Sequence, residues 1–113
     1  HYGCGGIKAA MGNQSIGLID NWIRHIKDVY RLHHTYLDSI INEEDRFNAF
    51  VELNVKEQVY DLAKTSIVQE AWKNGQDVTL HGWVYGLNSG YVTDLNVNIS
   101  SEKDLDLVYQ LKF

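Results

Sequence analysis

The sequence predicts an α/β fold in which helices predominate and the β-sheet is incomplete. Between residues 7 and 74, apolar side chains recur at three- and four-residue steps, the spacing of amphipathic helices. Two later segments, 78–85 and 91–97, have the β-branched and aromatic composition of strands. The first of these strands has apolar side chains on both faces, and such a strand normally lies inside a sheet of several strands. We therefore expect the missing strands to come from a partner chain or from sequence outside these 113 residues.

The first two predicted helices lie in the N-terminal third of the chain. Residues 7–11 form a short helix, which the Gly12-Asn13 pair ends. Residues 18–37 then form one long amphipathic helix, with an apolar stripe that includes Trp22 and Ile26 and a charged opposite face. This stripe is expected to face the core or a subunit interface.

Two more helices are predicted from capping signals. Asn42 is a candidate N-cap, because three acidic residues follow it where the helix dipole favours negative charge. The helix that it starts has an apolar stripe from 47 to 62. Ser66 with Gln69 three residues later is a capping-box pattern, which predicts a separate short helix that ends at Asn74-Gly75.

The C-terminal part is predicted to contain a hairpin and a final helix. Asn88-Ser89-Gly90 is a turn signal between the strands 78–85 and 91–97. Ser100 and Ser101 can then cap a last helix, with apolar side chains at Leu105, Val108, Tyr109 and Leu111. The chain has the length of one domain and no linker, so residues 1–113 are expected to form a single domain.

Composition excludes several classes of function. The net charge is −5 and the pI is about 5.4, which argues against a nucleic-acid partner or an anionic membrane surface. No apolar run approaches the ~20 residues needed to cross a bilayer. Cys4 is the only cysteine, so no internal disulfide can form, and a lone thiol favours a reducing compartment. We therefore expect a cytoplasmic protein.

The first six residues, His1-Tyr2-Gly3-Cys4-Gly5-Gly6, carry half of a candidate metal site. Imidazole and thiolate are donors that zinc prefers, and backbone N–H groups at a helix start stabilise a thiolate. A chain that begins on a candidate ligand rather than on Met is expected to be a piece of a longer one. The spacing alone does not decide between metal binding and a buried structural cysteine beside an ordinary histidine.

Five segments resemble the β-class carbonic anhydrases, in family order and over almost the whole chain. They are His1-Tyr2-Gly3-Cys4-Gly5-Gly6-Ile7-Lys8-Ala9-Ala10, Gly17-Leu18-Ile19-Asp20-Asn21-Trp22, Glu52-Leu53-Asn54-Val55, Glu57-Gln58-Val59 and His81-Gly82-Trp83-Val84-Tyr85-Gly86. The resemblance implies a mainly parallel β-sheet flanked by helices, which is incomplete in this chain. Residues 1–113 would be the C-terminal part of such a domain.

The resemblance also implies a function. Members of this family are zinc-dependent lyases that reversibly hydrate carbon dioxide to bicarbonate and a proton. They act as homodimers or homotetramers. Their zinc is held by two cysteines, one histidine and, in a resting form, one aspartate. On this chain the matching zinc ligands are His1 and Cys4, and Gly5 would line the substrate pocket.

The match to the family's catalytic residues is incomplete. The first cysteine ligand, the aspartate and its acid–base partner arginine belong to a Cys-x-Asp-Ser-Arg motif, which does not occur in residues 1–113. We therefore expect the isolated chain to bind zinc poorly and to be inactive. Tyr85 matches a tyrosine of an inhibitory bicarbonate pocket in some bacterial members, although it could equally be an aromatic residue that packs on the sheet.

The sequence also allows other interpretations. His25 and His34 are expected on the solvated face of their helix, His33 in the core and His81 along a strand, all without a metal role. His1 could instead bind copper through its amine and imidazole. The chain could also be a non-catalytic homologue or fragment that contributes an oligomer interface.

Overall fold

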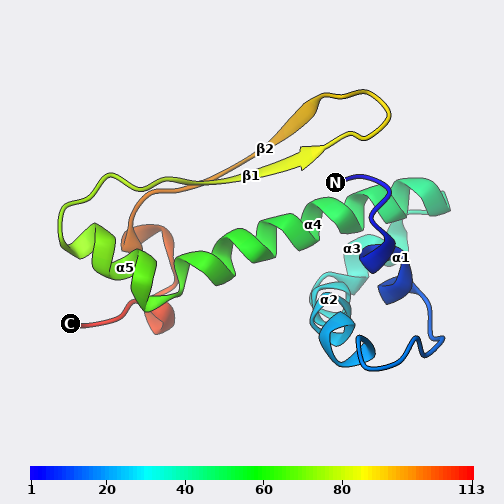
Figure 1. Cartoon of the computed structure of the whole chain (residues 1–113), viewed down its shortest axis with the longest axis horizontal. Helices are drawn as coiled ribbons and strands as arrows, with labels where there is room; N and C mark the ends of the chain where they lie inside the picture. The colour runs from blue at the N-terminus through cyan, green and yellow to red at the C-terminus, as the bar shows by residue number, and fades with distance from the viewer. The chain divides into compact units, whose positions relative to one another are not determined.

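The computed structural model describes residues 1–113 as five helices, a pair of strands and two short 3-10 turns. Figure 1 shows them in chain order: α1 (Gly5–Met11), α2 (Asp20–Leu32), α3 (His34–Ser39), α4 (Glu43–Ala63), α5 (Ser66–Lys73), β1 (Leu80–Tyr85), β2 (Val92–Ile99), η1 (Glu102–Asp104) and η2 (Leu107–Tyr109). The chain divides into two compact units. The first consists of residues 1–54 and 84–93, and the second of residues 55–83 and 94–113. None of the helices is both long enough and apolar enough to cross a membrane.

In the first unit, α1 lies against α2 and is fastened to it at its C-terminal end. The Lys27 ammonium on α2 donates hydrogen bonds to the carbonyl oxygens of Ala10 at 3.0 Å and Gly12 at 2.5 Å. These carbonyls have no partner inside a helix that ends at Met11, so the lysine satisfies them. The buried apolar residues of this unit include Ile7, Ala10, Ile23, Ile26, Leu37 and Phe50.

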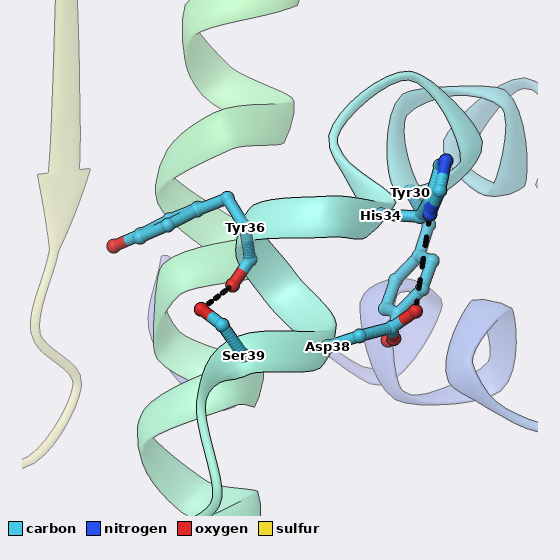
Figure 2. A network of polar contacts seen from close by, with 5 residues as sticks. All are labelled: Tyr30, His34, Tyr36, Asp38 and Ser39. Atoms are coloured by element: carbon cyan, nitrogen blue, oxygen red, sulfur yellow. Dashed lines mark hydrogen bonds and ion pairs between the residues drawn. The ribbon is translucent and has the colours of Figure 1, made fainter.

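The predicted single helix over 18–37 is wrong, because the structure has two helices that meet at His33. Tyr30 on α2 donates a hydrogen bond to Asp38 on α3, with 2.5 Å between the oxygens, and Figure 2 shows both Tyr30 and His34 directed at Asp38. Residues eight positions apart in one straight helix are separated by about 12 Å along its axis. The Tyr30–Asp38 contact therefore requires the break.

The start of α2 also differs from the prediction. The helix begins at Asp20, whose carboxylate accepts hydrogen bonds from the Ile16 and Gly17 N–H groups and from the Ser15 hydroxyl. The Ser15 bond comes first among the causes that lower the pKa of Asp20. Leu18 lies outside the helix and is 89% exposed, so it is not part of a core stripe.

The start of α4 is as predicted. The Asn42 side-chain oxygen accepts a hydrogen bond from the Asp45 N–H at 3.0 Å, which confirms Asn42 as the N-cap. One helix then runs from Glu43 to Ala63.

In the second unit, a small core joins the C-terminal part of α4 to the hairpin and to the C-terminal segment, residues 105–113. It consists of Val59, Ala63, Ile99 and Leu105, with Trp72, Leu80 and Val97 packed against it. Gly82 allows the close approach of β1 to α4 here. A Cβ atom at this position would lie 3.4 Å from the Val59 side chain and 3.5 Å from the Val97 side chain.

The structure confirms that a separate short helix, α5, follows α4, but the predicted N-cap of this helix is wrong. Thr65, not Ser66, is the N-cap, and its hydroxyl accepts a hydrogen bond from the Val68 N–H at 3.4 Å. Gln69 is 0% exposed and does not form a capping box, because its side chain binds the C-terminal segment instead. The helix ends at Asn74-Gly75 as predicted, with Gly75 at φ +77°.

The strands form the predicted hairpin. β1 and β2 pair as a two-stranded sheet, and consecutive strands joined by a tight turn run antiparallel. Gly82 and Val84 of β1 are buried, whereas Trp83 and Tyr85 on the other face are 56% and 45% exposed. The expected parallel sheet therefore has no strand pair of its own within residues 1–113.

The predicted last α-helix is wrong, because residues 102–109 form two 3-10 turns. Ser101 does cap the first turn, in a capping box with Asp104. The Gln69 side chain instead donates to the Tyr109 carbonyl and accepts from the Leu111 N–H, which an α-helix would pair with the Leu107 carbonyl. These bonds to Gln69 accompany the 3-10 turns in place of the helix.

Candidate metal centre

The N-terminal turn, residues His1–Cys4, leads directly into α1. Gly3 takes φ +75°, a conformation that favours glycine, and thereby reverses the chain between the two candidate ligands. Cys4 is the residue before α1, and its carbonyl oxygen accepts the Lys8 N–H at 3.1 Å. The Cys4 thiol makes no capping bond and is half-buried, so its sulfur is available as a ligand.

His1 is oriented by its neighbour. Its Nδ1 atom lies 2.9 Å from the Tyr2 carbonyl oxygen. When Nδ1 carries the proton and donates to this carbonyl, Nε2 keeps the lone pair that a metal binds. A second hydrogen bond of this kind is typical of metal-ligating histidines. The donors of the turn, one imidazole nitrogen and one sulfur, therefore fit zinc.

The chain does not complete the site. The structure brings together no group of three or more His, Cys, Asp or Glu side chains that could hold a metal ion. His34 Nδ1 lies 4.0 Å from Asp38 Oδ2, and His81 Nδ1 lies 2.6 Å from Asn98 Oδ1. Each of these histidines therefore has a partner of its own. A tetrahedral zinc site needs further donors from outside the N-terminal turn.

The other predicted site residues lie near the turn. Gly5 is the first residue of α1, and a Cβ atom there would meet no heavy atom within 4 Å, so the space beside it is open. Tyr85 is bonded to the turn through its main chain, because its carbonyl oxygen accepts the Tyr2 N–H at 3.0 Å. The roles of Gly5 and Tyr85 stay predictions.

Tyr2 and Glu52 are structural parts of this region that the sequence reasoning did not single out. The Tyr2 hydroxyl donates to Glu52 Oε1 of α4 at 2.5 Å. Burial, followed by this bond to a carboxylate, raises the pKa of Tyr2. The two residues are 50 positions apart, and only the presence of Glu52 in a family-like segment could have drawn attention to it.

A cavity of about 710 Å³ adjoins the turn. Gly3 contributes to its wall, together with Lys8, Met11, Gly12, Asn42, Glu43, Glu44 and Phe47. The cavity therefore lies between α1 and the start of α4, and it holds charged groups of both signs beside apolar side chains.

Comparison with known proteins identifies the family. The sequence profile described as "Carbonic anhydrase" matches residues 1–92. A solved β-carbonic anhydrase from Coccomyxa, in complex with acetazolamide, is similar over 92% of this chain, with a TM-score of 0.84 and 33% identity. The chain belongs to the β-carbonic anhydrases. The resemblance inferred from the sequence motifs is thus confirmed.

Other relatives give the same result and show how much of the family's length is present. A carbonic anhydrase of Emericella nidulans is 40% identical over 112 residues, which are 98% of this chain and 49% of the relative. One of two tetrameric β-carbonic anhydrases from Sordaria macrospora has a TM-score of 0.76 at 28% identity, over 88% of this chain and 51% of its own. The β-carbonic anhydrase CafA of Aspergillus fumigatus has a TM-score of 0.74 at 33% identity, over 85% and 45%. The chain spans about half the length of these relatives.

Proposed function

We propose that residues 1–113 supply the His1–Cys4 half of the zinc site of an enzyme that reversibly hydrates carbon dioxide. One observation carries the proposal: a nitrogen and a sulfur donor lie on one turn at the start of α1, within the residues that match the carbonic anhydrase family. Zinc, when bound at such a site, lowers the pKa of a water molecule to ~7. Carbon dioxide and bicarbonate are the corresponding substrates.

The chain's own residues hold and orient the donors. Lys27 fastens α1, and hence Cys4, to α2. The Tyr2 carbonyl orients the His1 ring, and the open space at Gly5 leaves room for a small substrate. The remaining ligands and the acid–base pair would have to come from a Cys-x-Asp-Ser-Arg motif of the kind that the family carries, which does not occur in residues 1–113.

The rest of the fold is part of the same proposal. The expected single domain contains a mainly parallel sheet, with a further strand beside β1. The Tyr2 N–H bond to the Tyr85 carbonyl supports this, because it already fastens the main chain of the turn to that strand. The exposed Trp83 on β1 and the tetrameric relative from Sordaria macrospora support an oligomer, either a homodimer or a homotetramer. The single thiol of Cys4 supports a reducing, cytoplasmic location.

The test compares the 113-residue chain with an extended polypeptide that also carries the Cys-x-Asp-Ser-Arg segment. The extended polypeptide is expected to contain zinc and to hydrate carbon dioxide, and Cys4→Ala is expected to lower both zinc content and activity at least ~100-fold because it removes a direct ligand. The isolated chain is expected to be inactive. Measurable hydration by the isolated chain, measured by stopped flow with a pH indicator, contradicts this part of the proposal.

A second candidate function is a non-catalytic, oligomer-interface role, which the exposed Leu18, Trp22 and Trp83 favour. An extended polypeptide that oligomerises without binding zinc supports this role, and bound copper in place of zinc supports a copper site at His1.

The proposed inhibitory bicarbonate pocket includes Tyr85. If this is correct, bicarbonate inhibits the active enzyme, and Tyr85→Phe relieves the inhibition.

A further inference from the structure

Tyr2 attaches the N-terminal turn to two other elements of the fold. Its N–H donates to the Tyr85 carbonyl on β1 at 3.0 Å, and its hydroxyl donates to Glu52 on α4 at 2.5 Å. Its own carbonyl oxygen lies 2.9 Å from His1 Nδ1. Both ends of the tyrosine are thus bound to regular secondary structure, and the histidine is bound to the tyrosine.

The two candidate ligands differ in how they are held. Cys4 continues into α1, which is fastened through the Lys8 N–H bond and through Lys27. His1 is exposed, and the bond that the structure gives its ring goes to Tyr2. Gly3 lies between them at φ +75°, and a glycine leaves the backbone free to move unless other contacts hold it. The position of His1 relative to Cys4 therefore depends on what holds Tyr2.

We propose that Tyr2 and Glu52 are positioning residues of the metal centre. The hydrogen bond between them holds the turn against α4, so that the His1 imidazole meets the same ion as the Cys4 thiolate. This inference rests on the proposed function, in which His1 and Cys4 are zinc ligands. Neither Tyr2 nor Glu52 is assigned contact with the metal. A bond from a hydroxyl to a carboxylate suits this task, because charge-assisted hydrogen bonds are short and strong.

The experiment measures zinc affinity of the extended polypeptide by chelator competition, with the absorption spectrum of the cobalt-substituted protein as a second readout. Tyr2→Phe removes the hydroxyl and keeps the ring. It is expected to weaken zinc binding about tenfold, the lower end of the range for residues that orient ligands, and to change the cobalt spectrum. Glu52→Ala is expected to match it. Glu52→Gln keeps a carbonyl acceptor and is expected to restore much of the affinity.

Tyr30→Phe is the matched control. Tyr30 also donates from a phenol to a carboxylate at 2.5 Å, in the same compact unit, but its partner Asp38 lies on α3 and not on the turn. Its removal is expected to leave zinc affinity and the cobalt spectrum unchanged. The double variant Tyr2→Phe/Glu52→Ala is expected to be no weaker than either single variant, because all three lack the same bond.

Each outcome distinguishes the positioning role from the alternatives. Wild-type affinity and an unchanged cobalt spectrum in Tyr2→Phe overturn the inference while leaving the proposed function intact. Equal losses in Tyr2→Phe and Tyr30→Phe also overturn it, since they indicate a general loss of stability. If the unmutated extended polypeptide binds no zinc, the proposed function itself fails, and the inference fails with it.

Discussion

The N-terminal turn, His1–Cys4, and the C-terminal segment, Leu105–Phe113, lie outside the regular helices and strands, yet both are held in place. In each case the bonds come from residues far away in the sequence. Glu52 binds Tyr2 across 50 positions, and Gln69 binds Tyr109 and Leu111 across 40 and 42 positions. Neither segment can take its conformation from local preferences alone.

The two segments differ in what remains unbonded. Gln69 is completely buried, and both ends of its amide are used in three hydrogen bonds to main-chain groups. In the N-terminal turn the bonds go to Tyr2, to main-chain groups and to one nitrogen of His1, while the Cys4 thiol makes no capping bond. A polar group whose hydrogen bonds are all made stabilises the structure. A nitrogen or sulfur atom that has no hydrogen bond and is attached to a rigid element can instead bind a metal ion. Two variants test this comparison, and a third removes a solvated polar bond that lies outside both segments.

Gln69→Ala is expected to have the largest effect on stability. It leaves buried main-chain groups without partners and creates a cavity, so the free energy of unfolding should fall by about 2–4 kcal/mol. Urea denaturation measures the loss. Gln58→Ala is the control, because Gln58 is an exposed glutamine in α4 and its removal should change the free energy by less than about 0.5 kcal/mol. Equal effects in the two variants would show that the C-terminal segment is not held as described.

Lys27→Met is expected to have a smaller effect, confined to the support of Cys4. It removes the ammonium that bonds the Ala10 and Gly12 carbonyls, at a cost of about 1 kcal/mol. Hydrogen exchange of the α1 amides should become faster, while the amides of α5 stay unchanged. Lys8→Met is the control, since Lys8 is exposed. Unaltered exchange in α1 of the Lys27 variant would show that the ammonium does not fasten the helix.

Tyr30→Phe should have the smallest effect, about 0.5–1 kcal/mol, because the bond that it removes is largely solvated. The bond to Asp38 raises the pKa of Tyr30 above its usual value of 10.0, followed in importance by burial. A raised pKa means that the contribution is fully present below about pH 10 and is lost as the pH rises through the folded-state pKa. The difference in unfolding free energy between wild type and variant should therefore shrink above this pH. A difference that stays constant from pH 8 to 11 contradicts this assignment.

Local signals predicted several ends of elements, although the start of α2 and the cap of α5 differ from the prediction. Gly12 ends α1, Asn42 caps α4, Asn74-Gly75 ends α5, and the turn after β1 makes a hairpin. Each of these depends on the backbone preferences of one or two residues, which the sequence states directly.

Two of the wrong predictions, the unbroken helix over 18–37 and the last helix, have a different cause. The break at His33 accompanies a bond between Tyr30 and Asp38, and bonds to Gln69 accompany the 3-10 turns in place of the last helix. The periodicity of apolar residues contains no information about polar bonds between different elements. The same limit applies to the metal centre. The motif predicts His1 and Cys4 as ligands, but it does not predict the hydrogen bond between Tyr2 and Glu52, which are 50 positions apart.

Position 3 of the turn excludes ordinary L-amino acids because of its backbone torsion and not because of a lack of space. An L side chain at this position would find no heavy atom within 4 Å, yet φ is +75°, in the half of conformational space that L-residues rarely enter. Steric room is therefore not what excludes alanine. A chemically synthesised protein with D-alanine at position 3 would match the observed φ. The L-alanine variant would favour a negative φ, which would change the position of the His1 imidazole relative to the Cys4 thiol.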